Sequence, residues 1–150
     1  MSTESKFLKG QVVLVGFGRV GSRVAEALDA RNIPYVVAEQ NREQVEALRK
    51  QGIAAVAGNA AEPAVLIQAH IANAAMLVIA TPDPVDIRQM ADNARKLNPG
   101  IEIVLRTYNA DEAQLLTKEG IGKVFFSEDE LAKSITSHIT TRFAPENNTH

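Results

Sequence analysis

The sequence predicts an α/β fold with a Rossmann-like, doubly wound parallel sheet of six strands in the order 3-2-1-4-5-6. Three observations support this prediction. Short apolar runs alternate with amphipathic segments along the chain. Several of these runs are continuously apolar, which is typical of strands that are covered by helices on both faces. A glycine-rich turn follows the first run, at the place where doubly wound sheets form their ligand crevice.

Six apolar runs are the predicted strands, at residues 11–15, 35–38, 54–57, 76–80, 101–105 and 123–126. Right-handed crossovers between parallel strands then give the doubly wound order. The chain has 150 residues, 45% of them hydrophobic, which suffices for one domain with its own core. We therefore expect a domain over residues 11–143, with flexible tails at 1–10 and 144–150.

The segments between the runs carry helix signals. The first three predicted helices are 19–30 with an apolar stripe of Val20, Val24, Ala27 and Leu28, 42–50 capped by Asn41, and 62–70 with Pro63 in its first turn. The fourth predicted helix begins at Asp83-Pro84 and runs to about Leu97. The fifth begins with a capping box of Asn109 and Glu112 and stops at Gly120, and the sixth begins with a capping box of Ser127 and Glu130 and runs to about Arg142.

Composition argues against several functional classes. The net charge of −2 is not that of a nucleic-acid-binding surface. The chain has no cysteine, which excludes disulfides and thiolate ligands, and its three histidines are scattered, so we expect no metal site. The sequence shows no signal-peptide pattern and no apolar run of about 20 residues, so we expect the chain itself to be soluble.

The turn Gly16-Phe17-Gly18-Arg19-Val20-Gly21 joins the first strand to the first helix and has the GxGxxG form. In such a turn the first glycine permits the sharp bend, the second lets a phosphate approach the backbone, and the third lets the helix lie close to the strand. The free N–H groups and the positive end of the helix dipole then face the phosphate, and Arg19 adds a cation.

An acidic residue near the end of the second strand is the second part of this pattern. Glu39 stands 23 residues after Gly16, near the expected separation, and Gln40 follows it. A carboxylate there can accept hydrogen bonds from ribose hydroxyls and repels a 2′-phosphate, which disfavours NADP. The alternative is that Glu39 only ends a strand and the glycines only make a tight turn.

Three further loops reach the same edge of the predicted sheet. The turn Gly58-Asn59-Ala60 follows the third strand, where Asn59 either reads an adenine edge or is a simple turn residue. Thr81 follows the fourth strand, where a dehydrogenase would hold nicotinamide. Arg106 ends the fifth strand, where an arginine is suited to meet an anion.

The sequence lacks the patterns of catalytic residues that an enzyme with such a crevice would carry. Neither tyrosine has a lysine four residues later, no histidine ends a strand, and a serine nucleophile elbow is absent. We therefore expect a protein that binds an adenine nucleotide, AMP or NAD(H) with ATP possible, without performing chemistry on it. The cofactor-binding half of an NAD-dependent oxidoreductase and a standalone dimeric scaffold are the alternatives.

Residues 12–21, Val-Val-Leu-Val-Gly-Phe-Gly-Arg-Val-Gly, resemble the start of the RCK N-terminal (TrkA-N) domain. The form is that of Kef-type antiporters of the monovalent cation:proton antiporter-2 family, most like their YbaL branch. The likeness continues through Glu39, Gly58-Asn59-Ala60, Thr81-Pro82-Asp83 and Ile103-Val104-Leu105-Arg106, and it covers about residues 11–143. It implies a domain on the cytoplasmic side of the bacterial inner membrane that binds NAD(H), AMP or ATP and gates a potassium (or other monovalent cation)/proton antiporter.

The resemblance also implies a homodimer formed through the last helix and the strand-6 edge, here residues 124–143. Leu131, Ile135 and Ile139 have helical spacing, and from the residues alone this stripe can equally pack on its own sheet. Asn59 and Tyr108 depart from the family, which commonly has Asp and, in Kef proteins, a second Arg, so glutathione-type regulation is not carried over. The transmembrane antiporter is absent from this sequence. An excised domain, favoured by the polar start, and a standalone subunit both stay open.

Overall fold

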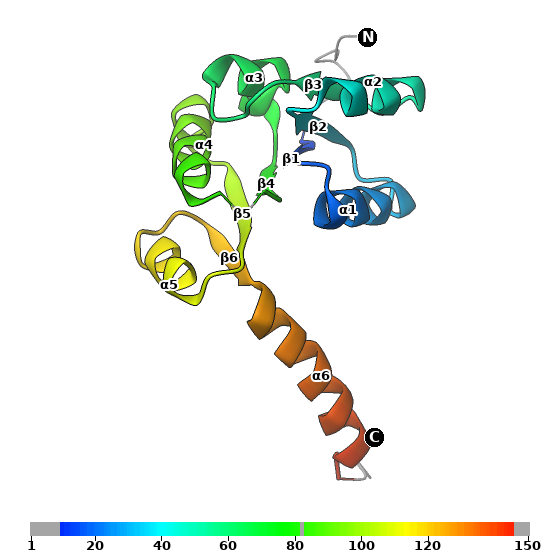
Figure 1. Ribbon diagram of the computed structural model, residues 1–150, viewed down its shortest axis with the longest axis vertical. Coiled ribbons are helices and arrows are strands. Elements are labelled where there is room, and N and C mark those ends of the chain that lie inside the picture. The colour runs from blue at the N-terminus through cyan, green and yellow to red at the C-terminus, as the bar shows by residue number, and fades with distance from the viewer. Residues whose placement is uncertain (1–9, 82, 146–150) are drawn as a thin grey trace.

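The computed structural model describes residues 10–81 and 83–145 and contains a six-stranded parallel sheet in the predicted order β3-β2-β1-β4-β5-β6 (Figure 1). The strands are β1 (Val12–Val15), β2 (Tyr35–Glu39), β3 (Ala55–Ala57), β4 (Met76–Ile79), β5 (Glu102–Thr107) and β6 (Lys123–Phe126). The helices are α1 (Arg19–Ala30), α2 (Arg42–Lys50), α3 (Pro63–Gln68), the 3-10 helix η2 (Ile71–Asn73), α4 (Pro84–Leu97), α5 (Ala110–Lys118) and α6 (Ser127–Phe143). The predicted fold class is confirmed. Most of the two predicted tails lies outside the described residues.

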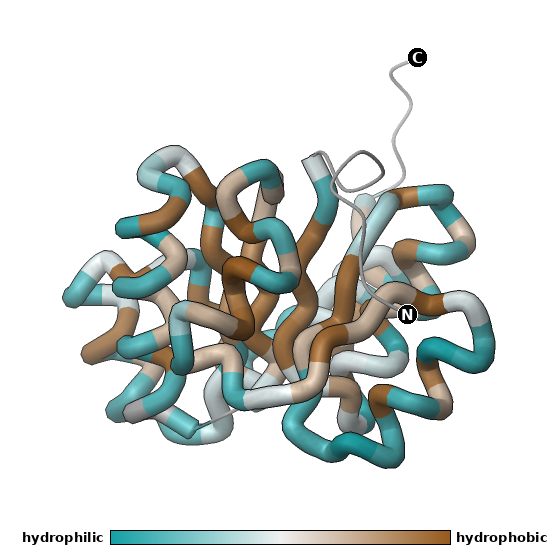
Figure 2. The backbone as a smooth tube through the Cα atoms, turned by 90° about the horizontal axis from the view of Figure 1, so that it is seen from above, coloured by the Kyte–Doolittle hydropathy of each residue, from teal (hydrophilic) through white to brown (hydrophobic). Residues whose placement is uncertain are grey.

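Two apolar clusters form the core, one on each face of the sheet. One cluster joins alternate strand residues such as Val13 and Leu77 to α3, α4 and α5. The other joins the intervening strand residues, such as Leu14 and Val37, to α1 and α2. Burial on both faces explains why the strand sequences are continuously apolar. Figure 2 shows these hydrophobic strands as brown segments between the helices.

Several local predictions need correction. The predicted helix 62–70 ends at Gln68, because His70 adopts a left-handed conformation (φ 59°) before η2 begins. The prediction of a capping box at Ser127 is wrong. Phe126 is the N-cap of α6, and the Ser127 hydroxyl donates instead to the Thr107 carbonyl at 3.3 Å. Asn109 does cap α5 by accepting the Glu112 N–H at 3.0 Å. The Glu112 carboxylate, however, pairs with Arg88, also at 3.0 Å, so only half of that box forms.

α6 extends away from the body of the molecule and does not fold back over the sheet (Figure 1). Its apolar stripe is solvent-exposed, with Leu131 63%, Ile135 52% and Ile139 49% exposed. The stripe therefore does not pack on its own sheet, which was one of the two alternatives that its spacing allowed. As a consequence, Val104 and Phe125 on the facing side of β5 and β6 are only half-buried.

Candidate functional site

The glycine turn between β1 and α1 is held by close backbone packing. Gly16 has a φ of +93°, and a Cβ on it would lie 2.8 Å from Cγ2 of Thr81. A Cβ on Gly21 would overlap the carbonyl oxygen of Gly16, so a glycine is needed there for α1 to approach the turn. Gly18 is different, because it is exposed, has a φ of −83° and has nothing within 4 Å of an added Cβ. Gly16 and Gly21 are therefore explained by packing, and Gly18 is not.

The Glu39 carboxylate lies beside this turn at the end of β2. One of its oxygens accepts the backbone N–H of Phe17 at 3.0 Å, and the other accepts the N–H of Asn41 at 2.7 Å. Each carboxylate oxygen can accept a second hydrogen bond. Glu39 thus fixes the position of the turn and keeps acceptor capacity for a hydroxyl group.

A cavity of about 70 Å³ lies at the carboxyl edge of the sheet between these elements. Six of the residues singled out in the sequence line it: Gly16, Glu39, Gln40, Gly58, Ala60 and Thr81. Val15, Ala38 and Met90 complete the lining. Gly18, Arg19 and Val20 are exposed at the start of α1, and Phe17 is half-buried in the same turn. The carboxyl ends of β1, β2 and β3 therefore meet around one hollow, as the strand order requires.

Asn59 and Arg106 lie differently from the other predicted site residues. The side-chain oxygen of Asn59 accepts the Ala61 N–H at 2.8 Å, which is a turn-stabilising bond and favours the turn-residue alternative. Arg106 is not among the residues that line the cavity. Its guanidinium donates to the Ala80 carbonyl at 3.2 Å and stacks on the Tyr108 ring, 4.5 Å from the ring centre.

Two contributors to this site were missed in the sequence. The Gln44 side chain, in the first turn of α2, donates to the Phe17 carbonyl at 2.9 Å. Met90 reaches the cavity from α4 and is 1% exposed. The only available signal was the position of Gln44 three residues after the helix cap Asn41, which places it beside the end of β2. Its contact with a turn 27 residues earlier depends on tertiary structure.

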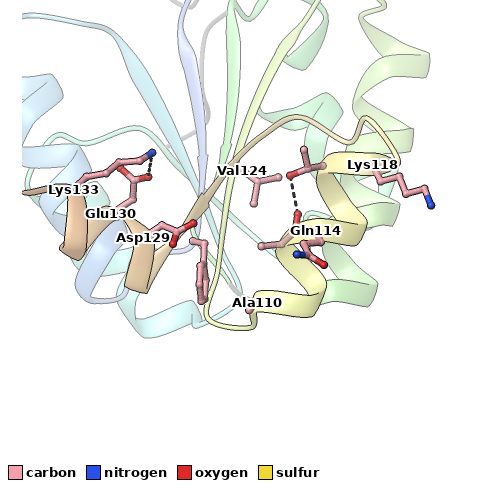
Figure 3. Close-up of a pocket in the computed structure, with 10 residues that line it drawn as sticks. Ala110, Gln114, Lys118, Val124, Asp129, Glu130 and Lys133 are labelled. Atoms are coloured by element: carbon pink, nitrogen blue, oxygen red, sulfur yellow. Dashed lines mark hydrogen bonds and ion pairs between the residues drawn. The ribbon is translucent and has the colours of Figure 1, made fainter.

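A second and larger hollow, of about 530 Å³, lies between α5, β6 and α6 (Figure 3). Ala110, Gln114 and Lys118 from α5 line one side, and Asp129, Glu130 and Lys133 from α6 line the other. Val124 and Phe126 form its apolar base. The Lys133 ammonium pairs with Glu130 within α6 at 3.1 Å. This groove exists because α6 extends away from the body, and it is an open surface rather than an enclosed ligand cavity.

Within residues 10–81 and 83–145, no group of three or more histidine, aspartate or glutamate residues is placed to hold a metal ion. No helix in this described part is long and apolar enough to cross a membrane.

Comparison with known proteins identifies the family. The model of the TrkA-N domain matches residues 12–127. This chain belongs to the TrkA-N domain family. It is 38% identical over 134 residues to the putative cation/proton antiporter YbaL of Escherichia coli K12, covering 89% of this chain and 24% of that protein. It is 28% identical over 136 residues to the putative K(+) efflux antiporter KefB of Alkalimonas amylolytica, covering 91% of this chain and 21% of that protein. The chain thus spans about a quarter or less of these curated relatives.

Two solved structures have folds similar to that of this chain. The TrkA-N domain of the inner membrane protein YbaL from E. coli superimposes with a TM-score of 0.80 at 37% identity, over 87% of this chain and 96% of that one. The AMP-bound form of the Kef C-terminal domain from Shewanella denitrificans gives a TM-score of 0.73 at 22% identity, over 91% and 82% of the two chains, and this second likeness concerns the fold alone. The predicted family and its YbaL branch are confirmed.

Proposed function

We propose that this TrkA-N domain binds an adenine nucleotide and gates a bacterial monovalent cation/proton antiporter without performing chemistry. One observation carries the proposal: Gly18 is exposed at the first turn of α1 and no packing requirement explains it. The orphan N–H groups and the dipole of a twelve-residue helix favour an anion at that place. Arg19 adds a positive charge beside them, and a charge-assisted hydrogen bond there contributes about 1.5–3 kcal/mol.

The ligand is AMP or NAD(H), with ATP as a further candidate. The cavity of about 70 Å³ is smaller than the roughly 300 Å³ of a typical ligand pocket, so it accommodates only part of a nucleotide. In our proposal the ribose hydroxyls bond to the spare acceptor positions of Glu39, and the phosphate lies over the exposed turn at Gly18. The AMP-bound Kef domain of the same fold supports the mononucleotide.

Gating requires that the nucleotide binds two states of the parent antiporter with different affinity. Typical coupling free energies of about 1–3 kcal/mol change such an equilibrium roughly 5- to 150-fold. The names of the relatives, a cation/proton antiporter and a K(+) efflux antiporter, support potassium or another monovalent cation as the transported ion. We accordingly propose that the domain works on the cytoplasmic side of the inner membrane, attached to or associated with the transmembrane antiporter.

The first test is mass spectrometry of small molecules released from the denatured protein, followed by calorimetry with AMP, ATP, NAD and NADH. We expect a stoichiometric adenine nucleotide, and Gly18→Asp should abolish its binding. Aspartate is a favourable N-cap, so the variant should fold at least as stably as the original chain. Gly100→Asp is the matched control, because it adds the same charge where nothing lies within 4 Å of a new Cβ.

Each other outcome of this test has a distinct meaning. Tight nucleotide binding by a folded Gly18→Asp protein contradicts the assignment of the site. Turnover of nicotinamide cofactor by the purified chain supports an oxidoreductase instead. No released ligand and no binding support a scaffold subunit with a vestigial turn. In the parent antiporter, Gly18→Asp should remove the nucleotide dependence of cation flux.

We further propose that two copies of the domain pair through α6. The exposed stripe of Leu131, Ile135 and Ile139 and the half-buried Val104 and Phe125 are apolar surfaces that a second copy can cover. Analytical ultracentrifugation should show a dimer that Ile135→Asp converts to a folded monomer, whereas Thr136→Asp, on an adjacent position of α6, is the charge-matched control. A monomer at high micromolar concentration contradicts the proposal.

A further inference from the structure

Both backbone polar groups of Phe17, between the two glycines of the turn, are held by side chains from outside the turn. The Phe17 N–H donates to Glu39 at 3.0 Å, and the Phe17 carbonyl accepts from the Gln44 amide nitrogen at 2.9 Å. Both of these hydrogen bonds are partly buried. The turn is therefore fixed by β2 on one side and by α2 on the other.

The hydrogen bond from Gln44 determines which way the next N–H points. The peptide between Phe17 and Gly18 is planar and trans, so its carbonyl and its N–H point in opposite directions. Because Gln44 holds the carbonyl toward α2, the Gly18 N–H points away from α2. In the described part of the chain this N–H has no protein acceptor. It is thus a preset donor at the exposed start of α1.

Without this hydrogen bond the turn has other conformations available. Gly16 and Gly18 flank Phe17, and glycine populates many backbone conformations at little cost. Rotation of the Phe17–Gly18 peptide would replace the outward N–H by a carbonyl oxygen, which repels an anion. A neutral side chain that donates to the Phe17 carbonyl prevents this rotation and adds no negative charge near the anion.

The hydrogen bond from Gln44 also belongs to a closed set that includes the carboxylate. Glu39 accepts the Asn41 N–H at 2.7 Å, and the Asn41 side chain accepts the Gln44 N–H at 3.0 Å. The end of β2, the start of α2 and the glycine turn are therefore connected through Glu39, Asn41 and Gln44. We propose that Gln44 is a positioning residue that holds the Gly18 N–H ready for the phosphate of the nucleotide. This inference rests on the proposed function and adds a determinant of phosphate affinity outside the glycine motif.

The test separates phosphate binding from nucleoside binding. Gln44→Met keeps the length of the side chain and removes its donor. We expect it to weaken AMP binding about tenfold in calorimetry, the effect of one hydrogen bond, and to change adenosine binding less than twofold. Gln44→Glu should weaken AMP binding more, because it places an acceptor and a negative charge beside the Phe17 carbonyl. Gln89→Met, the same change at an exposed position of α4, is the control.

A second measurement needs no substitution. The Gly18 amide resonance in a ¹⁵N–¹H NMR spectrum should shift on addition of AMP and stay in place on addition of adenosine. Equal losses of AMP and adenosine affinity in Gln44→Met, unchanged AMP affinity in that variant, or a Gly18 amide that does not respond to AMP would each overturn the inference. Absence of AMP binding by the unmodified chain would instead contradict the proposed function itself.

Discussion

α1 and α6 carry the same kind of apolar stripe and lie in opposite surroundings. α1 buries Gly21 and Ala25 and half-buries Val24 and Leu28 against the β1–β2 side of the sheet. α6 has no buried residue at all, although its apolar side chains recur with the same spacing. Apolar periodicity therefore establishes a helix and its apolar side, and it does not establish what covers that side.

The connection before each helix explains the difference. A three-residue turn at 16–18 separates β1 from α1, and Gly21 lets the helix start lie on that turn. At the other end of α1, the Tyr35 hydroxyl donates to Asp29 at 3.0 Å, and burial together with this bond raises the pKa of Tyr35 to about 12. α6 begins at Ser127 directly after Phe126, the last residue of β6. No turn redirects the chain, so α6 continues outward.

The largest effect is expected from a substitution that prevents the close approach of α1 to its turn. Gly21→Ala introduces a methyl group that overlaps the Gly16 carbonyl oxygen. We expect a loss of about 3 kcal/mol in the free energy of unfolding, at the upper end of the usual cost of overpacking, because backbone atoms cannot move aside easily. Urea denaturation followed by circular dichroism measures this loss.

Gly18→Ala is the control for that experiment, since it lies in the same turn and has open space around its Cβ. Its free energy of unfolding should stay within about 0.5 kcal/mol of the original value. If Gly18→Ala and Gly21→Ala destabilise the protein equally, the turn depends on glycine flexibility and not on the packing of α1.

The fold followed from the sequence because its signals are local and repeated. Six apolar runs with caps and glycines between them are enough to define a doubly wound sheet, whose crossovers have one hand. The predicted apolar stripe of α1 is wrong in part. Val20 and Ala27 are exposed, and Gly21 and Ala25 are buried in their place. The turn brings α1 so close to the sheet that its smallest residues face inward, which apolarity alone does not indicate.

The site was predictable where the backbone determines it and unpredictable where side chains do. Gly16, Glu39 and Thr81 share one cavity because parallel strands end at one edge. The contacts of Gln44 with Phe17 and of Asn59 with Ala61 depend on rotamers and on the distance between elements. A polar side chain can form equally good hydrogen bonds with several different groups, so the partner that it uses can be identified only from the three-dimensional structure.

Truncation of one leucine in each helix compares how much α1 and α6 contribute to stability, with smaller expected effects. Leu28→Ala in α1 should cost about 2 kcal/mol, the lower end for a leucine that is packed against a core cluster. Leu131→Ala in α6 should cost less than about 0.5 kcal/mol at nanomolar protein concentration, where an exposed side chain has no partner to lose.

The stability cost of Leu131→Ala should rise with protein concentration if a second copy covers α6, because dimerisation then contributes to stability by mass action. Denaturation of both variants at several concentrations measures this. A concentration-independent loss for Leu131→Ala as large as that for Leu28→Ala would mean that α6 packs on its own sheet in solution, and that the two helices do not differ after all.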